Sequence, residues 1–435
     1  MIKESQIVIK NREELIFLLS EASQIEHMVM CQYLFAAFSL KQDASEGLDV
    51  TQLEAVKRWE RNISAIAVQE MIHLAIASNL LISIGAVPFF YRPNFPQHAR
   101  YFPLGFQFVL LPFGEQGLEH FLFLERPEGM VLEDAVDLDL LETSPKRPTT
   151  PTTADDEEVV PEAQDYATVG HLYRGIEQGF RYLVDKYGEK QVFIAPPEIQ
   201  ANQQDFGWPE LIPVTDLASA IKVIETIVEE GEGARGSWQE AHYGKFLRMK
   251  KEYRELKQQD SNFEPARPVL AAYVRSPSDI TGNVVLITDP ITADIVNLFN
   301  ASYEVLLRLL NRFFVHGGET DDELQTLCDA AVNTMILVIK PLGQLIATLP
   351  IGPKAPGKTA GVSFDIYRTS YLLPHRETAW PILHERLVEI VNHCKVLTSE
   401  ISTRNNNLIS VEENLQKLTA ALGDMSSDHI PALPN

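Results

Sequence analysis

The segment Glu70-Met71-Ile72-His73 carries a carboxylate and an imidazole three residues apart, which puts both on one side of a helix. The surrounding residues 62–84 are mostly apolar and contain no Gly or Pro, so a long helix is expected there. Because an isolated buried charge is costly, Glu70 on an apolar stripe needs a neutralising partner. Helical bundles use inward Glu-x-x-His pairs to hold iron or manganese. The spacing alone is weak evidence, since it occurs in many helices. The apolar residues at helical spacing from Glu70 are Ile63, Ile66, Ala67, Leu74 and Ala77.

A second carboxylate, Glu26, lies on the apolar stripe of the helix expected over residues 12–40. Residues 41–50 form a polar loop between this helix and the Glu70 helix. The sequence therefore predicts an antiparallel helical hairpin with both glutamates facing its seam.

A third helix is expected over residues 167–187, with Glu177 four residues after Tyr173 on its apolar face. The alternative is an ordinary ion pair with Arg181 one turn later. Both interpretations stay open at this point.

The fourth carboxylate comes from a helix that Asp216 caps. Its apolar stripe continues to Glu232, within Gly231-Glu232-Gly233. The two glycines predict a break or a bulge in the helix. The helix is expected to restart near Ser237, with His242 on a face shared with Trp238 and Phe246. The residue three before His242 is Gln239, so this helix lacks a simple Glu-x-x-His unit. The residues that could supply its carboxylate are Glu232, Glu229 and Glu225.

Together these helices offer the ligand set of a bundle that binds two metal ions through carboxylates. Clustered glutamates without a metal would repel one another, and two divalent cations would stabilise them. We expect two iron ions or, alternatively, manganese. The expected ligands are Glu26, Glu70, His73, Glu177, Glu232 and His242. Tyr33, seven residues after Glu26, is either an electron donor or substrate contact, or a core tyrosine.

The sequence as a whole predicts a mainly α protein. We expect a ferritin-like four-helix bundle over residues 1–258 and a C-terminal helical domain over residues 291–435. Prolines favour a small irregular or β excursion at 86–140, including a strand near 106–111, and a linker at 259–290. The Pro-, Thr- and acid-rich stretch 142–165 is typical of an exposed, mobile loop. Residues 361–367 either line a pocket or anchor a loop. Four C-terminal histidines show no metal-ligand spacing: His316, His375, His384 and His393.

Composition narrows the classes of partner. The net charge of -23 argues against binding to nucleic acid or to anionic membranes, and we expect no apolar run long enough to span a bilayer. The three cysteines lie far apart in apolar runs, as free thiols of a reducing compartment do. We expect a cytoplasmic protein, a possible homodimer, whose partners are a small organic substrate and O2 or peroxide.

The segments 26–34 (EHMVMCQYL) and 70–74 (EMIHL) resemble the ferritin-like family that includes the iminophenyl-pyruvate dimer synthases of violacein- and rebeccamycin-type biosynthesis. Segments 228–233 and 241–243 are similar to the fourth helix of that family, and the resemblance spans roughly residues 7–255. It implies a ferritin-like core and the same six metal ligands. It also implies an oxidoreductase that couples an amino-acid-derived imine. The alternatives are a non-catalytic metal-storage protein and a carrier protein.

Overall fold

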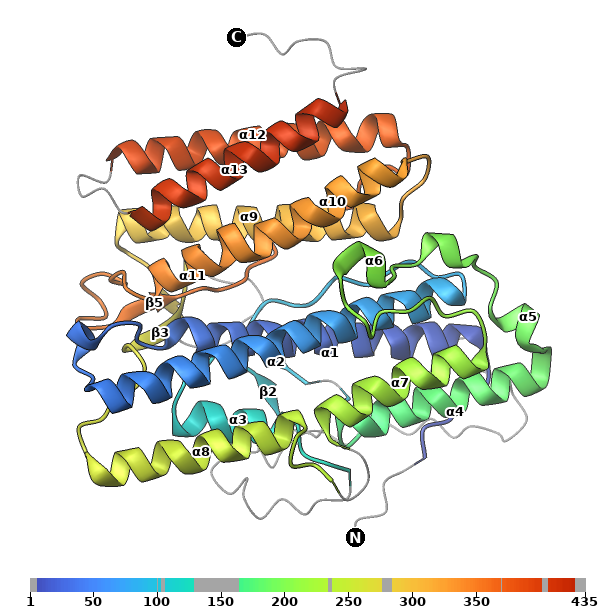
Figure 1. Ribbon diagram of the computed structural model, residues 1–435, viewed down its shortest axis with the longest axis horizontal. Coiled ribbons are helices and arrows are strands. Elements are labelled where there is room, and N and C mark those ends of the chain that lie inside the picture. Colours follow the sequence, from blue (N-terminus) through green and yellow to red (C-terminus); the bar gives the residue numbers. More distant parts are fainter. Residues whose placement is uncertain are drawn as a thin grey trace.

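Two long antiparallel helices, α1 (Arg12–Ser39) and α2 (Val50–Ser83), run through the centre of the computed structural model (Figure 1). The side chain of Asn11 accepts a hydrogen bond from the Glu14 amide at the start of α1, and Asp49 and Gln52 form a capping box on α2. The expected helical hairpin is therefore present. The structure describes residues 6–99, 101–102, 106–128, 164–233, 237–275, 284–368, 370–400 and 406–426.

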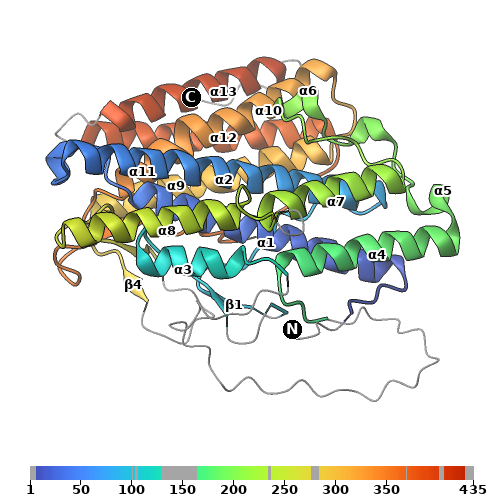
Figure 2. The same ribbon diagram turned by 60° about the horizontal axis from the view of Figure 1, so that its bottom comes forward.

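The other two helices of the bundle are each divided. One consists of α3 (Glu115–Leu124) and α4 (Val169–Tyr187), and the other of α7 (Leu217–Gly231) and α8 (His242–Gln259). In Figures 1 and 2, α3 and α4 follow one line beside the hairpin, and α8 and α7 follow a second. The halves meet near the middle of α1 and α2. Each division therefore places helix ends, rather than a continuous helix face, at the centre of the bundle.

The excursion after α2 contains a strand pair and also a helix that sequence reasoning missed. Strands β1 (Gln97–His98) and β2 (Gln107–Phe108) are antiparallel, near the expected position. Helix α3 follows Pro112, where the density of prolines upstream hid a helix of only 10 residues.

The C-terminal helices form two further layers on the hairpin (Figure 1). Helices α9 (Pro290–Phe314), α10 (Asp321–Thr334) and α11 (Lys340–Ile346) lie next to α1 and α2, and α12 (Arg376–Glu400) and α13 (Asn406–Ser426) cover them. A π-helical turn, η3 (Met335–Ile339), joins α10 to α11.

The expected linker contributes two strands to a small parallel sheet with the order β4-β3-β5. These strands are β3 (Val269–Tyr273), β4 (Val285–Leu286) and β5 (Thr359–Gly361). The division into domains stays a prediction, and residues 142–163 of the expected mobile loop lie outside the described residues. Short helical turns complete the chain: η1 (Ala44–Glu46), α5 (Glu189–Val192), η2 (Pro197–Ile199) and α6 (Gln203–Phe206).

One sequence-based expectation needs correction. Two helical stretches, Val50–Ser83 and Asp321–Ile346, are long and apolar enough by composition to cross a membrane. In α2 most of that apolar stretch is buried within the protein, so core packing accounts for its composition. All three cysteines are free and buried, as expected.

Candidate metal centre

Five buried side chains converge at the centre of the bundle. They form two triads, Glu26–Glu70–His73 and Glu70–Glu125–His242, and in each triad the potential ligand atoms all lie within 4.8 Å of one another. Glu70 belongs to both triads. Its Oε2 lies 2.9 Å from Nδ1 of His73, and its Oε1 lies 3.0 Å from Nδ1 of His242. The arrangement places one shared carboxylate between two half-sites.

The residues present fit a pair of metal ions. Glu70 Oε1 and His242 Nδ1 are both buried, and neither has a hydrogen-bond partner among the described residues, although they face each other. A buried polar atom without a partner costs free energy, and a cation between these two atoms would supply the missing interaction. Imidazole and carboxylate donors together suit iron and manganese.

In both imidazoles Nδ1 faces the shared carboxylate of Glu70, and Nε2, on the opposite side of the ring, contacts another oxygen. His242 Nε2 lies 3.2 Å from the amide oxygen of Gln69, and His73 Nε2 lies 3.0 Å from Oε2 of Glu230. Lys245 also donates to that amide oxygen of Gln69, at 3.1 Å. Because both contacts are to oxygens, each Nε2 is placed to donate its proton, and each Nδ1 would bind a metal after releasing the proton that it carries in the metal-free cluster. Such outer hydrogen bonds usually fix the orientation of metal-binding histidines.

Two tyrosines hold the outer carboxylates. Tyr173 donates from its hydroxyl to Glu26 Oε1 at 2.7 Å, and Tyr33 donates to Glu125 Oε1. The Tyr33 ring packs against Phe121 and is fully buried. Tyr33 is thus a core tyrosine whose hydroxyl positions one candidate ligand.

Opposite charges in the cluster shift its pKa values. Burial raises the pKa of Glu26 to about 7, helped by the neighbouring Glu70 and opposed by His73. Burial alone would lower the pKa of His242, but the carboxylates of Glu70 and Glu125 raise it to about 9. Burial likewise favours protonated Glu70, yet His242 and His73 outweigh it and lower that pKa. Without metal, the imidazoles therefore carry the positive charge that balances the carboxylates.

Glu177 lies outside the cluster, and this placement corrects the expected ligand set. Its carboxylate accepts two hydrogen bonds from Arg181, at 2.7 and 2.9 Å, on the outer side of α4. The inward position one turn earlier belongs to Tyr173, which is fully buried. The alternative of an ordinary ion pair is the one that the structure shows.

Glu232 lines the same pocket but is engaged elsewhere. Its Oε1 accepts from the Gly170 amide at 2.7 Å and its Oε2 from the Glu128 amide at 3.1 Å. Burial raises its pKa to about 7. It thus caps the start of α4 and is in neither triad. Of the α7 carboxylates, Glu230 contacts a candidate ligand, although the sequence had offered Glu232, Glu229 and Glu225.

Glu125 is the ligand candidate that sequence reasoning missed. It directly follows the apolar run 121–124 at the C-terminal end of α3. A carboxylate immediately after a buried apolar turn could have signalled it. The apolar residues that close the pocket around the triads are Ile25, Val29, Leu124, Val169, Ile227 and Val228.

The ferritin-like family profile matches residues 19–251, more than half of the chain and all the residues of both triads. The chain belongs to the ferritin-like family. This membership and the four-helix arrangement confirm the fold class inferred from the sequence, and two relatives confirm the resemblance.

Two characterised relatives align along most of this ferritin-like chain. Dichlorochromopyrrolate synthase from Lentzea aerocolonigenes is 28% identical over 90% of this chain and 40% of its own length. The 2-imino-3-(indol-3-yl)propanoate dimerase of Chromobacterium violaceum is 25% identical over 82% of this chain and 35% of its own. The chain thus spans about 40% or less of the length of these relatives, both of which are biosynthetic enzymes. A solved ferritin-like protein from Caulobacter vibrioides is 17% identical, with a TM-score of 0.45, over 74% of this chain and 96% of that one.

Proposed function

We propose that this protein is a metal-dependent oxidoreductase that holds two metal ions, iron or alternatively manganese. The observation that carries the proposal is the shared carboxylate of Glu70 between two triads of buried ligands. Glu26 and His73 would complete one half-site, and Glu125 and His242 the other. When bound, the metal pair would supply the electron-transfer chemistry that organic side chains lack.

The names of the relatives support a substrate class. One of them dimerises an indolyl imine of propanoate, and the other is named as a synthase of a dichlorinated chromopyrrolate. We infer that this chain couples an amino-acid-derived imine oxidatively. Joining two imines through a new carbon–carbon bond releases two protons and two electrons. Peroxide would take up both to give two waters, and O2 would take them up to give hydrogen peroxide.

The chain's own residues would hold the reaction in a dry, fixed setting. Tyr173 and Tyr33 orient the outer carboxylates, and Gln69 orients His242. The apolar wall of the pocket excludes water, which strengthens the electrostatic interactions inside. Glu230, whose side chain is 22% exposed, is the most accessible carboxylate in contact with a candidate ligand. Its position marks the side from which a substrate would approach.

The net charge of -23 supports a protein that acts on small molecules without nucleic acid or a membrane. We place the activity in the cytoplasm, and a homodimer stays part of the proposal.

The decisive experiment measures metal content and turnover together. The purified protein should contain about two metal ions per chain, as this type of bundle site holds. With 2-imino-3-(indol-3-yl)propanoate and O2 or peroxide, mass spectrometry should then detect a dimer. Glu70→Gln should lose both metals and the product, and Glu177→Gln, a matched change outside the triads, should retain both. Bound metal without turnover of any aromatic imine would indicate a storage or carrier protein instead. A folded parent without metal would overturn the proposal.

A further inference from the structure

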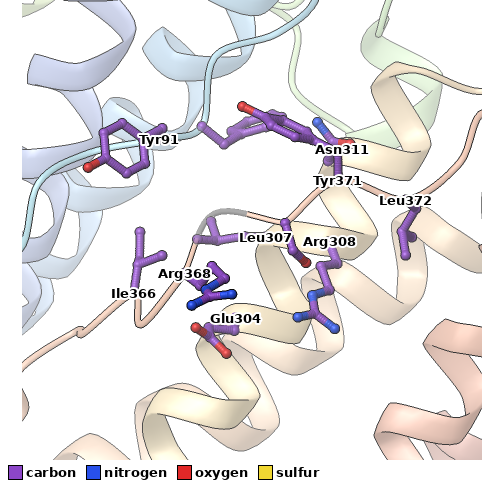
Figure 3. Close-up of a pocket in the computed structure, with 11 residues that line it drawn as sticks. Tyr91, Glu304, Leu307, Arg308, Asn311, Ile366, Arg368, Tyr371 and Leu372 are labelled. Carbon is purple, nitrogen blue, oxygen red and sulfur yellow. The ribbon is translucent and has the colours of Figure 1, made fainter.

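A second pocket lies between α9 and two loops, the segments after α2 and after β5 (Figure 3). Helix α9 contributes Glu304, Arg308 and Asn311, which share one helix face at successive turns. The segment after β5 contributes Arg368 and Tyr371. Sequence reasoning singled out residues 361–367 as either pocket-lining or anchoring, and the segment does both.

The anchoring part is a strained turn at Phe364, a non-glycine residue with φ of 51°. Its ring packs against Tyr303, and its carbonyl accepts a hydrogen bond from the Arg92 guanidinium. Beyond this turn, Ile366 and Arg368 reach the pocket. The buried anchor thus fixes the direction in which the arginine leaves the core.

The pocket contains two arginines that are not paired with any other described residue. Neither Arg308 nor Arg368 makes a hydrogen bond or ion pair within the part of the chain that the structure describes. Acidic residues outnumber basic residues by 60 to 37 in the sequence, so neither arginine lacks a partner for want of carboxylates in the chain. The pocket's own carboxylate, Glu304, accepts from the Tyr367 amide at 3.0 Å. The pocket therefore has net positive charge and two planar donors that match an oxyanion.

An apolar cavity adjoins this pocket and shares the side chains of Phe90 and Leu307 with it. The interior of the cavity has a volume of about 80 Å³, smaller than the roughly 150 Å³ of a cavity that binds benzene, so an aromatic ring would also occupy the open space at its mouth. Trp208 and Phe314 are among the aromatic residues that line it. The cavity is suited to the apolar body of a ligand whose anionic group lies between the arginines.

We propose that the two adjoining pockets form one binding site for an aromatic carboxylate. The arginines would bind the carboxylate, and the aromatic ring would enter the cavity past Phe90 and Leu307. No described residue lines both this site and the metal centre, because the cavity uses other faces of α1 and α2. The inference therefore goes beyond the proposed function and does not depend on a metal.

The test uses two ligands that differ only in charge, 2-naphthoate and 2-naphthamide, measured by titration calorimetry on the purified protein. The parent should bind 2-naphthoate at least about tenfold more tightly than 2-naphthamide, because two charge-assisted hydrogen-bonding groups face the carboxylate. Combining Arg308→Gln with Arg368→Gln should remove that preference and leave binding of 2-naphthamide within about twofold. Leu307→Trp, at the half-buried wall that the two pockets share, should weaken the binding of both ligands.

Two controls separate this site from general effects. Arg61→Gln removes an exposed arginine on α2 that likewise has no hydrogen bond or ion pair among the described residues, and it should change neither affinity. Glu70→Gln should bind 2-naphthoate as the parent does, so a failed metal centre and a failed acid site give different results. Equal affinities for the two ligands, or a double arginine variant that keeps the preference for 2-naphthoate, would overturn the proposal. Circular dichroism confirms that each variant folds.

Discussion

Glu26 and His27 are neighbours on α1, and both are buried, yet they face different surroundings. Glu26 faces the metal centre, 3.8 Å from Nδ1 of His73. His27 faces the C-terminal layer, where its Nδ1 lies 3.0 Å from the Phe90 carbonyl and its Nε2 contacts the Tyr303 hydroxyl. One side of the helix gathers carboxylates and imidazoles, and the other gathers neutral polar groups beside the buried guanidinium of Arg92.

The comparison shows that suitable donor types do not by themselves make a metal site. Histidine, cysteine and tyrosine also meet on the C-terminal side, where Cys31 Sγ lies 3.2 Å from the Tyr303 hydroxyl. Burial, together with the Arg92 charge, lowers the pKa of His27 well below its usual value, and burial raises the pKa of Cys31. Both ring nitrogens of His27 are already engaged, and the thiol stays protonated. On the Glu26 side, by contrast, Glu70 Oε1 and His242 Nδ1 are unsatisfied atoms that face each other and that a cation can bring together.

The largest expected effect follows from removing an imidazole on the metal side. His73→Ala should lower bound metal at least about tenfold, because it removes a direct ligand of one half-site. Metal analysis after dialysis measures the loss, and circular dichroism shows whether the fold is kept. A full metal complement in this variant would exclude the first triad as a metal site.

The matched change on the other side is His27→Ala. It should leave metal content unchanged and lower the free energy of unfolding by about 2–4 kcal/mol, because the Tyr303 hydroxyl and the Phe90 carbonyl lose a buried partner. Urea unfolding followed by circular dichroism gives the change. Loss of metal in this variant would show that the two sides of α1 are not independent.

A smaller effect is expected at a hydrogen bond that supports the centre. Tyr173→Phe removes the hydroxyl that donates to Glu26 and should cost about 1 kcal/mol of unfolding free energy. The control is Tyr182→Phe on the same helix, where the side chain is 46% exposed and little change is expected. Equal effects of the two variants in urea unfolding would argue against a positioning role for Tyr173.

The smallest effect concerns a charged pair outside both sides of α1. Burial favours protonated Glu323, but hydrogen bonds from Arg376 and the Thr320 amide outweigh it and lower the pKa below 4.5. Because this pKa is lower in the folded protein, ionised Glu323 stabilises it at neutral pH, and the stabilisation is lost as the pH falls from about 4.5 through the folded value.

Glu323→Gln should therefore lower the unfolding free energy by about 0.5 kcal/mol at pH 7 and by less near pH 3. Urea midpoints across this range test it. A difference that does not depend on pH would assign the effect to packing instead of charge.

Helical periodicity was sufficient to predict the ligand candidates on unbroken helices. Glu26, Glu70 and His73 lie where an apolar stripe should continue, and the structure brings them together. Periodicity gave the wrong position for Glu177. Its side chain points in a direction slightly different from that of Tyr173, and this difference places it in an ion pair with Arg181 outside the core.

At the end of a helix, apolar periodicity is a poor guide to the direction in which a side chain points. Glu125 directly follows α3 and Glu230 lies in the last turn of α7, so the tertiary path of the chain decides where each side chain points. His242, the first residue of α8, was predicted as a ligand, and the structure places it in the second triad. The sequence predicted a break near Glu232 but could not tell which carboxylate the break turns inward. The C-terminal cavity escaped prediction because its walls come from segments far apart in the chain.

The guanidinium of Arg126 bonds to the carbonyls of Phe123, in the last turn of α3, and of Ala167, just before α4. It therefore ties together the two points where the chain leaves and re-enters the bundle. The entropy of closing a loop grows only slowly with loop length, so segments of very different size can be accommodated between these points. Because Arg126 holds the two ends of the connection together, a change in its length need not move Glu125. The Arg126 tie thus makes the position of Glu125 independent of the length of the chain between α3 and α4.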